Sequence, residues 1–398
     1  MIEFLKLSED RRRGIIGVID YTQGIPEKAV EKDWWVTLAL KALFTCEYSE
    51  SIVFKGGTSL SKCWNLIERF SEDIDIALNS EAFGISYTVN PGKNYVTNLK
   101  KKGCEFISNE LKSSLEKQLL SFGVPQELFS LEAAPIDPKM PDKDPQVLFL
   151  KYKSLFETNS YLADQVKIEI STRSQKEPSK KVSINSFIGV SQFAAEYTYK
   201  EDPIELTAVE PHRTFLEKAF LLHEEFIKPD KTKIRAERMS RHLYDLERMM
   251  DHETGTKALN DHQLYESIVL HRENYSRLGW VDYKTLHRDT INFLPEEDIL
   301  KLYEKDYQSM CEEMIYGEAP EFNELIKRIR RLNNRFRTNP IPPKTITVQP
   351  EFPPYKFFKN EDEQKPDTWR IDVGDTFRIF RLKNILLKPI ETRTSLAL

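Results

Sequence analysis

The stretch Phe54-Lys-Gly-Gly-Thr-Ser-Leu-Ser-Lys62, followed by Arg69-Phe-Ser-Glu-Asp-Ile-Asp-Ile76, decides the fold of this chain. The apolar run over 51–54 predicts a short buried strand, and the apolar spacing over 58–70 predicts a helix. The diglycine between them removes two Cβ atoms at a point where a backbone can approach a phosphate. A second apolar run, 74–78, predicts the next strand.

Asp73 and Asp75 stand two residues apart at the start of that second strand, so both carboxylates project from one face. Two such acids can share divalent metal ions that clamp the attacking and leaving oxygens of phosphoryl transfer. Mg²⁺ (or Mn²⁺) suits the site because it binds hard oxygen ligands and substrate phosphates together. A lone Asp-x-Asp is usually a solvated strand end, and a lone diglycine is usually a turn. Their combination predicts a nucleotidyl-transfer architecture that binds a nucleoside triphosphate.

The rest of the chain predicts an α+β fold with a mixed sheet flanked by helices. Helices are expected over 26–45 and 94–121, and further strands over 147–153 and 165–171. After Pro211 the pattern is almost wholly helical, which predicts a mainly helical second domain. We therefore divide the chain into a core domain, a helical domain, and a proline-rich connector with a β-rich appendage: 1–205, 206–338 and 339–398. The appendage is expected to be a hairpin over 369–381 around Gly374-Asp375.

Composition fits a soluble globular protein, with 40% apolar and 30% charged residues in 398. No apolar run is long enough for a membrane span, and the N-terminal segment does not have the pattern of a signal peptide. The four cysteines are scattered, without zinc spacing, which favours a reduced cytoplasm. A net charge of −5 argues against a basic coat but permits a local basic strip.

The segment FKGGTSLSKCWNLIERFSEDIDIAL closely resembles the AbiEii/AbiGii family of nucleotidyltransferase-like toxins, in the polymerase-β-type superfamily. Further stretches are similar to other motifs of that family, and together they cover roughly residues 25–335. These stretches are Glu31-Lys-Asp33, Val166-Lys-Ile-Glu169 with Arg173, Pro211-His-Arg-Thr-Phe-Leu-Glu-Lys218 with Leu222-His223, and Arg238-Met-Ser-Arg-His-Leu-Tyr-Asp245.

The resemblance implies a role for each matching position. The diglycine loop would hold triphosphate oxygens through Gly56, Gly57, Thr58 and Ser59. Asp73 and Asp75 would ligate the metal ion. Lys218 would contact the phosphates of the nucleotide, and Asp245 would orient that lysine or help activate the acceptor. A cation is needed there because negative charge accumulates on the transferring phosphoryl group.

Four other residues have a functional and an ordinary reading. Glu169 is either a third catalytic carboxylate or a solvent-facing strand glutamate. Lys62 lies one turn beyond Thr58 and either faces the nucleotide phosphates or lies on the surface. Arg69 and Ser71, beside the two acids, are interpreted as ordering the metal-binding strand or contacting ribose and phosphate. Each of the four is carried as a candidate site residue.

Two basic clusters could track a nucleic-acid backbone, one over 231–241 and one over 327–337. The second lies on an expected helix whose apolar stripe leaves its charges toward solvent. The ordinary interpretation of both clusters is a solvated surface. The functional interpretation is a basic surface that binds RNA, which would appear as strong salt dependence of binding.

The resemblance implies transfer of a nucleoside monophosphate from a triphosphate to an acceptor, with the 3′ end of tRNA favoured. We expect a growth-arresting toxin of a toxin–antitoxin, phage-defence type of system, neutralised by an antitoxin encoded beside it. Two alternatives remain. One is an enzyme with a protein or small-molecule acceptor, and the other is a non-catalytic module that binds a nucleotide and acts through its partner.

Overall fold

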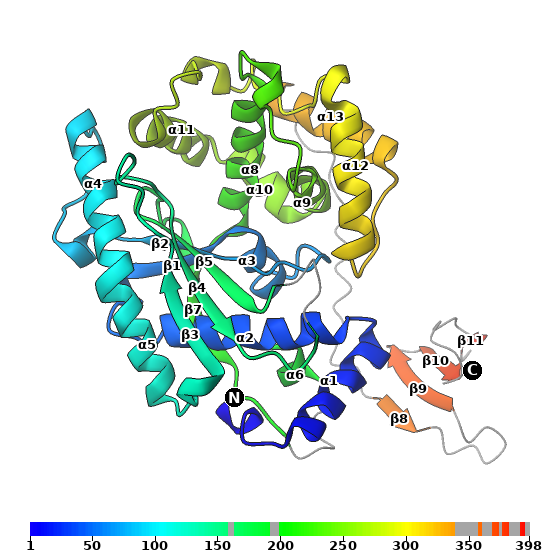
Figure 1. Ribbon diagram of the computed structural model, residues 1–398. Coiled ribbons are helices and arrows are strands. Elements are labelled where there is room, and N and C mark those ends of the chain that lie inside the picture. The colour runs from blue at the N-terminus through cyan, green and yellow to red at the C-terminus, as the bar shows by residue number, and fades with distance from the viewer. Residues whose placement is uncertain are drawn as a thin grey trace. The chain divides into compact units, whose positions relative to one another are not determined.

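The computed structural model describes residues 1–157, 163–191 and 199–338, together with the backbone of four strands in the C-terminal segment. It divides the chain into two compact units, Met1–Ile341 and Pro342–Leu398. The first unit contains a mixed sheet with its helices and a bundle of further helices (Figure 1).

A seven-stranded sheet, in the order β3-β4-β5-β2-β1-β7-β6, organises the first unit. Strands β2 and β5 pair in parallel, as do β1 and β7, and the other neighbours are antiparallel. The expected mixed sheet is confirmed. Its strands are β1 (Ile52–Lys55), β2 (Ile74–Leu78), β3 (Phe129–Ala133), β4 (Gln146–Tyr152), β5 (Gln165–Ser171), β6 (Ser179–Ile184) and β7 (Ile204–Val209).

Helix α2 (Glu27–Leu43) is almost entirely buried, including Trp34 and its neighbours, and packs against the sheet and α5. The helix expected over 26–45 is confirmed. The helix expected over 94–121 is present as α4 (Lys93–Phe106) and α5 (Lys112–Ser121), joined by a π-helical turn. Sequence patterns did not indicate α1 (Glu9–Gln23), α6 (Phe187–Val190), β3, β6 or β7.

The helix that follows the diglycine is shorter than expected. We predicted it over 58–70, but α3 spans Gly56–Lys62. Asn65 then adopts a left-handed backbone with φ 51°, which ends the helical path. Phe70 donates its N–H to the carbonyl of Met314 at 2.7 Å, so the chain between α3 and β2 is held by the helical bundle. Apolar spacing continues through this segment because it packs against that bundle.

The helical bundle after residue 211 confirms the predicted helical segment. Its helices are α8 (Pro211–Phe226), α9 (Ser240–Met250), α10 (Glu253–Asn260), α11 (His262–His271), α12 (Glu297–Glu313) and α13 (Phe322–Thr338). They enclose a core of their own, in which Phe215, Leu243 and Phe336 are fully buried. A separate core lies between the sheet and the helices of the N-terminal half. Because β7 continues to Val209, the sheet passes the boundary that we placed at residue 205.

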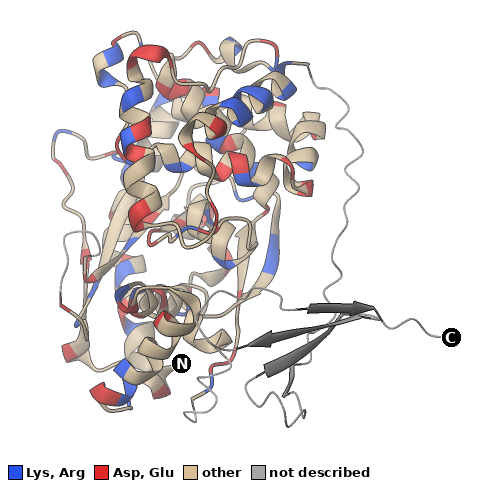
Figure 2. Cartoon of the chain, turned by 90° about the vertical axis from the view of Figure 1, so that its right-hand side faces the viewer, with Lys and Arg blue, Asp and Glu red and all other residues tan. Residues whose placement is uncertain are grey.

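The α13 helix carries the second basic cluster. Lys327, Arg330 and Arg331 are exposed, whereas Arg328 and Arg335 form ion pairs with acids around the end of α9. Acidic and basic residues alternate along the described helices (Figure 2). Lys327 and Arg331 pair with Glu324 on the same helix, and Arg337 donates to the carbonyl of Ile291. The structure therefore gives five residues of this cluster partners within the bundle.

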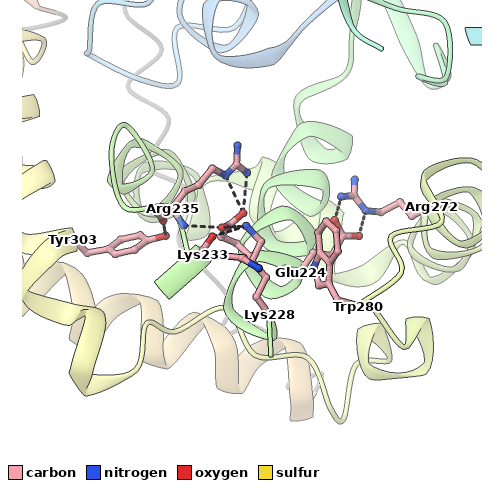
Figure 3. A network of polar contacts seen from close by, with 8 residues as sticks. Glu224, Lys228, Lys233, Arg235, Arg272, Trp280 and Tyr303 are labelled. Carbon is pink, nitrogen blue, oxygen red and sulfur yellow. Dashed lines mark hydrogen bonds and ion pairs between the residues drawn. The ribbon is translucent and has the colours of Figure 1, made fainter. Parts of the chain in front are cut away.

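A network of polar contacts fixes the C-terminal end of α8 (Figure 3). Glu224 pairs with Arg272, and its carbonyl accepts from Trp280 Nε1 at 3.1 Å. Glu225 binds Lys228 and, through its other oxygen, Arg235 at 2.9 Å. Because both glutamates are buried, these contacts compensate their charges and hold α8 in one position.

The second unit contains a four-stranded sheet in the order β11-β10-β9-β8. The expected hairpin is present as β9 (Thr368–Val373) paired antiparallel with β10 (Thr376–Arg381), and Gly374-Asp375 lies outside the described residues. The other two strands are β8 (Phe357–Lys359) and β11 (Glu391–Thr394). Within the described part of the chain, no helix is long and apolar enough to cross a membrane.

Candidate active site

Three charged side chains form a row across the middle of the sheet. Lys55 on β1 is in register with Asp75 on β2, and Asp75 is in register with Glu169 on β5. Residues opposite one another on neighbouring strands share a face, so the three side chains project to the same side. Lys55 Nζ lies 3.5 Å from Glu217 Oε2 on α8, which identifies this side as the one covered by the helical bundle.

Burial is the main reason why both aspartates resist ionisation. Burial, with the nearby Glu169 and Asp73, raises the pKa of Asp75 to about 6, although Lys55 and Arg241 oppose this. Burial also raises the pKa of Asp73, against the attraction of Lys167. The charged forms of both carboxylates are therefore disfavoured by burial, and a bound cation would favour them.

Glu169 forms an ion pair with Lys167, two residues earlier on β5. The structure places its backbone directly beside that of Asp75, so Glu169 is the second acid of the row. Lys167 lies on the same face and is the cation that most favours the charged form of Asp73.

Gly56 has to be a glycine because the Asp75 carboxylate lies against it. Its φ is +80°, and a Cβ built there would stand 1.9 Å from Asp75 Oδ2. A side chain at this position would displace the carboxylate or distort the backbone. The first glycine of the motif thus leaves the space that the aspartate occupies.

Gly57 lies against the segment that carries Arg69. A Cβ at Gly57 would be 2.7 Å from Arg69 Nη2 and 3.1 Å from Ser71 Oγ. Thr58 donates to the carbonyl of Asp73, and its hydroxyl lies 2.8 Å from that of Ser71. These contacts fasten the start of α3 to the strand that bears the aspartates.

Ser59 turns back on the diglycine. Its hydroxyl donates to the carbonyl of Gly56 at 2.9 Å, and its side chain is fully buried. Thr58 is equally buried. Of the four residues expected to hold phosphate oxygens, the two glycines therefore offer only their backbone, and both hydroxyls have partners within the motif.

A buried triad of charges lies behind the diglycine. Arg69 donates through Nε and Nη2 to the two carboxylate oxygens of Asp245, at 2.7 and 2.8 Å. Lys218 Nζ lies 2.8 Å from Asp245 Oδ2. Arg69 is 2% exposed and Asp245 0%, so the pair is dry. Burial alone would raise the pKa of Asp245, but Arg69 and Lys218 lower it strongly.

Lys218 differs from Arg69 in how its charge is tolerated. Burial lowers the pKa of Lys218, and the attraction of Asp245 only partly offsets this. For Arg69, by contrast, Asp245 outweighs burial and raises the pKa. Lys218 Nζ also lies 3.3 Å from His242 Nδ1, and burial keeps the pKa of that imidazole far below its usual range. Lys218 is thus a buried ammonium with one carboxylate that it shares with a guanidinium.

Two further cations lie near the aspartates: Lys55 was not singled out from the sequence, and Arg241 was expected only as a possible contact of the acceptor. Lys55 stands in register with Asp75, and a lysine directly before the diglycine was the available signal. Arg241 favours the charged forms of both Asp73 and Asp75, and its Nε is buried without a hydrogen-bond partner among the described residues. Its place four residues before Asp245 on α9 was the signal for it.

Lys62 does not join this group in the described conformation. Its Nζ lies 2.6 Å from Asp33 Oδ1 and donates to the carbonyl of Asn185 at 3.2 Å. The neighbouring Lys32 pairs with Glu72, directly before Asp73. The charged residues of α2 therefore anchor both ends of the motif, and Lys62 has a structural partner in place of the surface exposure that was its ordinary interpretation.

The donor set suits a hard divalent cation, although it is not a complete cage. In the described segments, no three His, Cys, Asp or Glu side chains converge as a ready-made metal cluster. Asp73 and Asp75 supply carboxylate oxygens on one face, and the absence of a side chain at Gly56 makes room for the Asp75 carboxylate itself. Mg²⁺ often binds through one or two carboxylates and completes its shell with water and substrate phosphates. The residues present fit that mode.

Comparison with known families agrees with this geometry. The family model described as nucleotidyl transferase AbiEii toxin, type IV toxin–antitoxin system, matches residues 38–331. The chain belongs to the AbiEii nucleotidyltransferase toxin family. No match was found among curated proteins or among solved structures. The AbiEii match spans the sheet, the diglycine motif and the bundle as far as α13.

Family membership indicates the activity and the kind of partner of this chain, but not the role of single residues. AbiEii proteins are nucleotidyltransferase toxins of type IV toxin–antitoxin systems, so nucleotidyl transfer and an antitoxin partner follow for this chain. Nucleotidyltransferases generally use divalent metal ions. The AbiEii match ends at residue 331, before the second compact unit.

Proposed function

We propose that this chain transfers a nucleoside monophosphate from a nucleoside triphosphate to an acceptor hydroxyl, with the 3′ end of tRNA as acceptor. The observation that carries the proposal is the fit of the Asp75 carboxylate against Gly56, in register with Glu169. This arrangement brings the carboxylates of Asp75 and Glu169 together on one face of the sheet, beside the diglycine, and a metal-bound triphosphate is proposed to bind there.

Asp73 and Asp75 would hold the metal, either Mg²⁺ or Mn²⁺. When bound, the ion neutralises charge that develops on the phosphoryl oxygens. Around it, Gly56 and Gly57 allow the triphosphate to approach the chain closely. Lys55 stands beside Asp75, favours its charged form more than any other cation, and is proposed to balance the phosphates.

In the proposed reaction the acceptor hydroxyl oxygen forms a bond to the α-phosphorus, and the bond from that phosphorus to the bridging oxygen breaks. Pyrophosphate leaves with the electron pair. Glu169 is proposed to accept the proton of the acceptor hydroxyl, since it stands beside Asp75 at the same face. Lys218 is proposed to contact the phosphates, and Asp245 to hold that lysine in place.

We assign Arg69, Ser71, Thr58 and Ser59 to positioning. Arg69 lies against Gly57 and binds Asp245, so it connects the diglycine with the lysine. Ser71 and Thr58 fasten the start of α3 to the aspartate strand. Lys62 is proposed to act through Asp33, as an anchor of α3, and not on the nucleotide itself.

Blocking the 3′ end of tRNA would stop aminoacylation, which gives a growth-arresting toxin, active against phage-infected cells. Support for the RNA acceptor comes from exposed basic residues on α13 such as Lys327, Arg330 and Arg331. A protein or small-molecule acceptor would use the same aspartates and the same triphosphate, so only the acceptor distinguishes these cases.

The experiment is incubation with each α-labelled triphosphate, in Mg²⁺ or Mn²⁺, with total RNA and with protein extract. We expect label in RNA, in the tRNA fraction, and none with Asp75→Asn. Glu132→Gln is the matched control, because Glu132 is an exposed acid on β3 that pairs with Lys151. Label in protein would show that the acceptor is a protein and not tRNA. Absence of label with every triphosphate would overturn the proposal. Growth arrest that persists in Asp75→Asn would instead favour a binding module.

A further inference from the structure

A cavity of about 690 Å³ lies at the C-terminal ends of β2 and β5, beside the carboxylate row. Ala77 lines it and stands two residues beyond Asp75 on β2, on the same face of the strand. Two strand residues span about 7 Å, so the cavity begins within the length of one nucleotide from the aspartates. Its volume falls within the range of small-molecule sites.

Two further contacts join the cavity to the candidate active site. Lys55 donates to Ser174 Oγ at 3.1 Å, and Ser174 lines the cavity. Lys55 also faces Glu217 on α8, which binds Arg213 one turn earlier at 2.9 Å. Arg213 lines the cavity as well. Helix α8 therefore runs as one wall from the aspartates to the cavity.

Aromatic rings cover one side of this cavity. Tyr87 lies parallel to Tyr275, with ring centroids 5.8 Å apart and an interplanar angle of 1°. His271 is stacked on Tyr275 at 4.4 Å. Tyr275 is buried, whereas Tyr87 is 50% exposed, so much of the Tyr87 side chain remains uncovered. All three rings line the cavity.

The loop that presents Tyr87 is held on both sides. Tyr275 donates its hydroxyl to the carbonyl of Thr88 at 2.5 Å. Tyr95 on α4 donates to the carbonyl of Ser86 at 2.7 Å. The two residues that flank Tyr87 are thus tied to the bundle and to α4. An exposed ring on a fixed loop offers a platform that loses little entropy when a planar ligand stacks on it.

We propose that this cavity is a nucleoside subsite in which a nucleobase stacks on the ring of Tyr87. Base–aromatic stacking accepts every base, because each base has a π-face. The side-chain amide of Gln263 lines the same cavity and can both donate to and accept from a base edge. Gln175 also lines it, where its amide donates to the Tyr87 hydroxyl at 3.4 Å and accepts from Arg213. The identity of the ligand rests on the proposed function, which brings a nucleoside triphosphate to the neighbouring aspartates.

The base can come from the incoming triphosphate or from the end of the acceptor. The test is direct binding of the four nucleoside triphosphates with Mg²⁺, of inorganic tripolyphosphate, and of a short single-stranded RNA, measured by calorimetry on the full chain. Tyr87→Ala is compared with Tyr87→Phe, which keeps the ring. Val89→Ala is the matched control, since Val89 is 58% exposed on the same loop and does not line the cavity.

We expect Tyr87→Ala to weaken triphosphate binding by about 5- to 150-fold, the loss of one base–aromatic stack. Tyr87→Ala should bind tripolyphosphate as the wild type does. Tyr87→Phe and Val89→Ala should bind the triphosphates as the wild type does. If RNA binding falls and triphosphate binding does not, the base belongs to the acceptor and the subsite stands. If neither falls, the subsite is refuted, even when the wild type transfers label. Ring-dependent binding without any transfer would refute the proposed function and leave the subsite.

Discussion

Arg69 and Lys218 share the buried carboxylate of Asp245. We predict that removing Arg69 mainly lowers stability, whereas removing Lys218 mainly abolishes activity. Arg69→Met removes two charge-assisted hydrogen bonds, of 2.7 and 2.8 Å, from a carboxylate that is 0% exposed. Hydrogen bonds to charged groups contribute about 1.5–3 kcal/mol each, and breaking a buried ion pair costs about 3–5 kcal/mol. We therefore expect the free energy of unfolding to fall by about 3–5 kcal/mol.

Lys218→Met should leave the fold nearly intact. Burial lowers the pKa of Lys218 despite the nearby Asp245, so the folded protein disfavours its charged form. Removing that charge still leaves Asp245 bound by both nitrogens of Arg69. Methionine fills a similar volume, and we expect the free energy of unfolding to change by less than about 1.5 kcal/mol. Nucleotidyl transfer should nevertheless be lost, since this lysine is proposed to contact the phosphates.

The assay pairs urea unfolding, followed by circular dichroism, with transfer of α-labelled triphosphate. The predicted outcome is a stable, inactive Lys218→Met protein and an unstable Arg69→Met protein. Equal destabilisation by the two substitutions would refute the argument that Arg69 carries the structural half of the triad. Full activity of Lys218→Met would refute the functional half.

Three further outcomes are expected. Gly56→Ala should abolish transfer by displacing the Asp75 carboxylate. The control is Gly123→Ala, which has a similar φ of +88° and no atom near its Cβ, and which should lower the free energy of unfolding by only about 1–3 kcal/mol and keep activity. Equal activities of the two variants in the transfer assay would contradict this. Lys55→Met should raise the KM for the triphosphate in steady-state assays, because it removes a cation beside Asp75; an unchanged KM would remove Lys55 from the site. Burial lowers the pKa of His271 to about 4 from 6.5, so the unfolded chain binds the proton first as pH falls, and stability should drop by about 1–3 kcal/mol between pH 6.5 and 4. In urea titrations at several pH values, His271→Gln should flatten that decline, whereas the control His287→Gln, at an exposed histidine, should not. Parallel declines in the wild type and both variants would refute this role of His271.

The sequence allowed prediction of the parts of the site that are local in the chain. Gly56, Gly57, Asp73 and Asp75 lie within one strand–helix–strand unit, so their spacing alone indicated a shared face. The length of α3 was wrong because Asn65 leaves the helical region, and apolar spacing does not report a left-handed residue.

Contacts between distant segments could not be derived from spacing. Arg69 and Asp245 are separated by 176 positions, and their pairing depends on how the bundle packs against the diglycine. The register of Asp75 with Glu169 requires the parallel pairing of β2 and β5, which no local pattern fixes. Tyr87 gave no signal at all, since an isolated aromatic residue in a loop is common and its meaning comes from Tyr275 and the cavity beside it.

The most direct test of the account is a crystal structure of the protein with a non-hydrolysable nucleoside triphosphate and Mn²⁺, with anomalous difference density recorded at the manganese edge. We predict a peak between the carboxylates of Asp73 and Asp75, with the triphosphate chain alongside Gly56 and Gly57. A nucleotide bound in the crystal with no anomalous peak at those aspartates, or with its phosphates at another face of the sheet, would contradict the central claim.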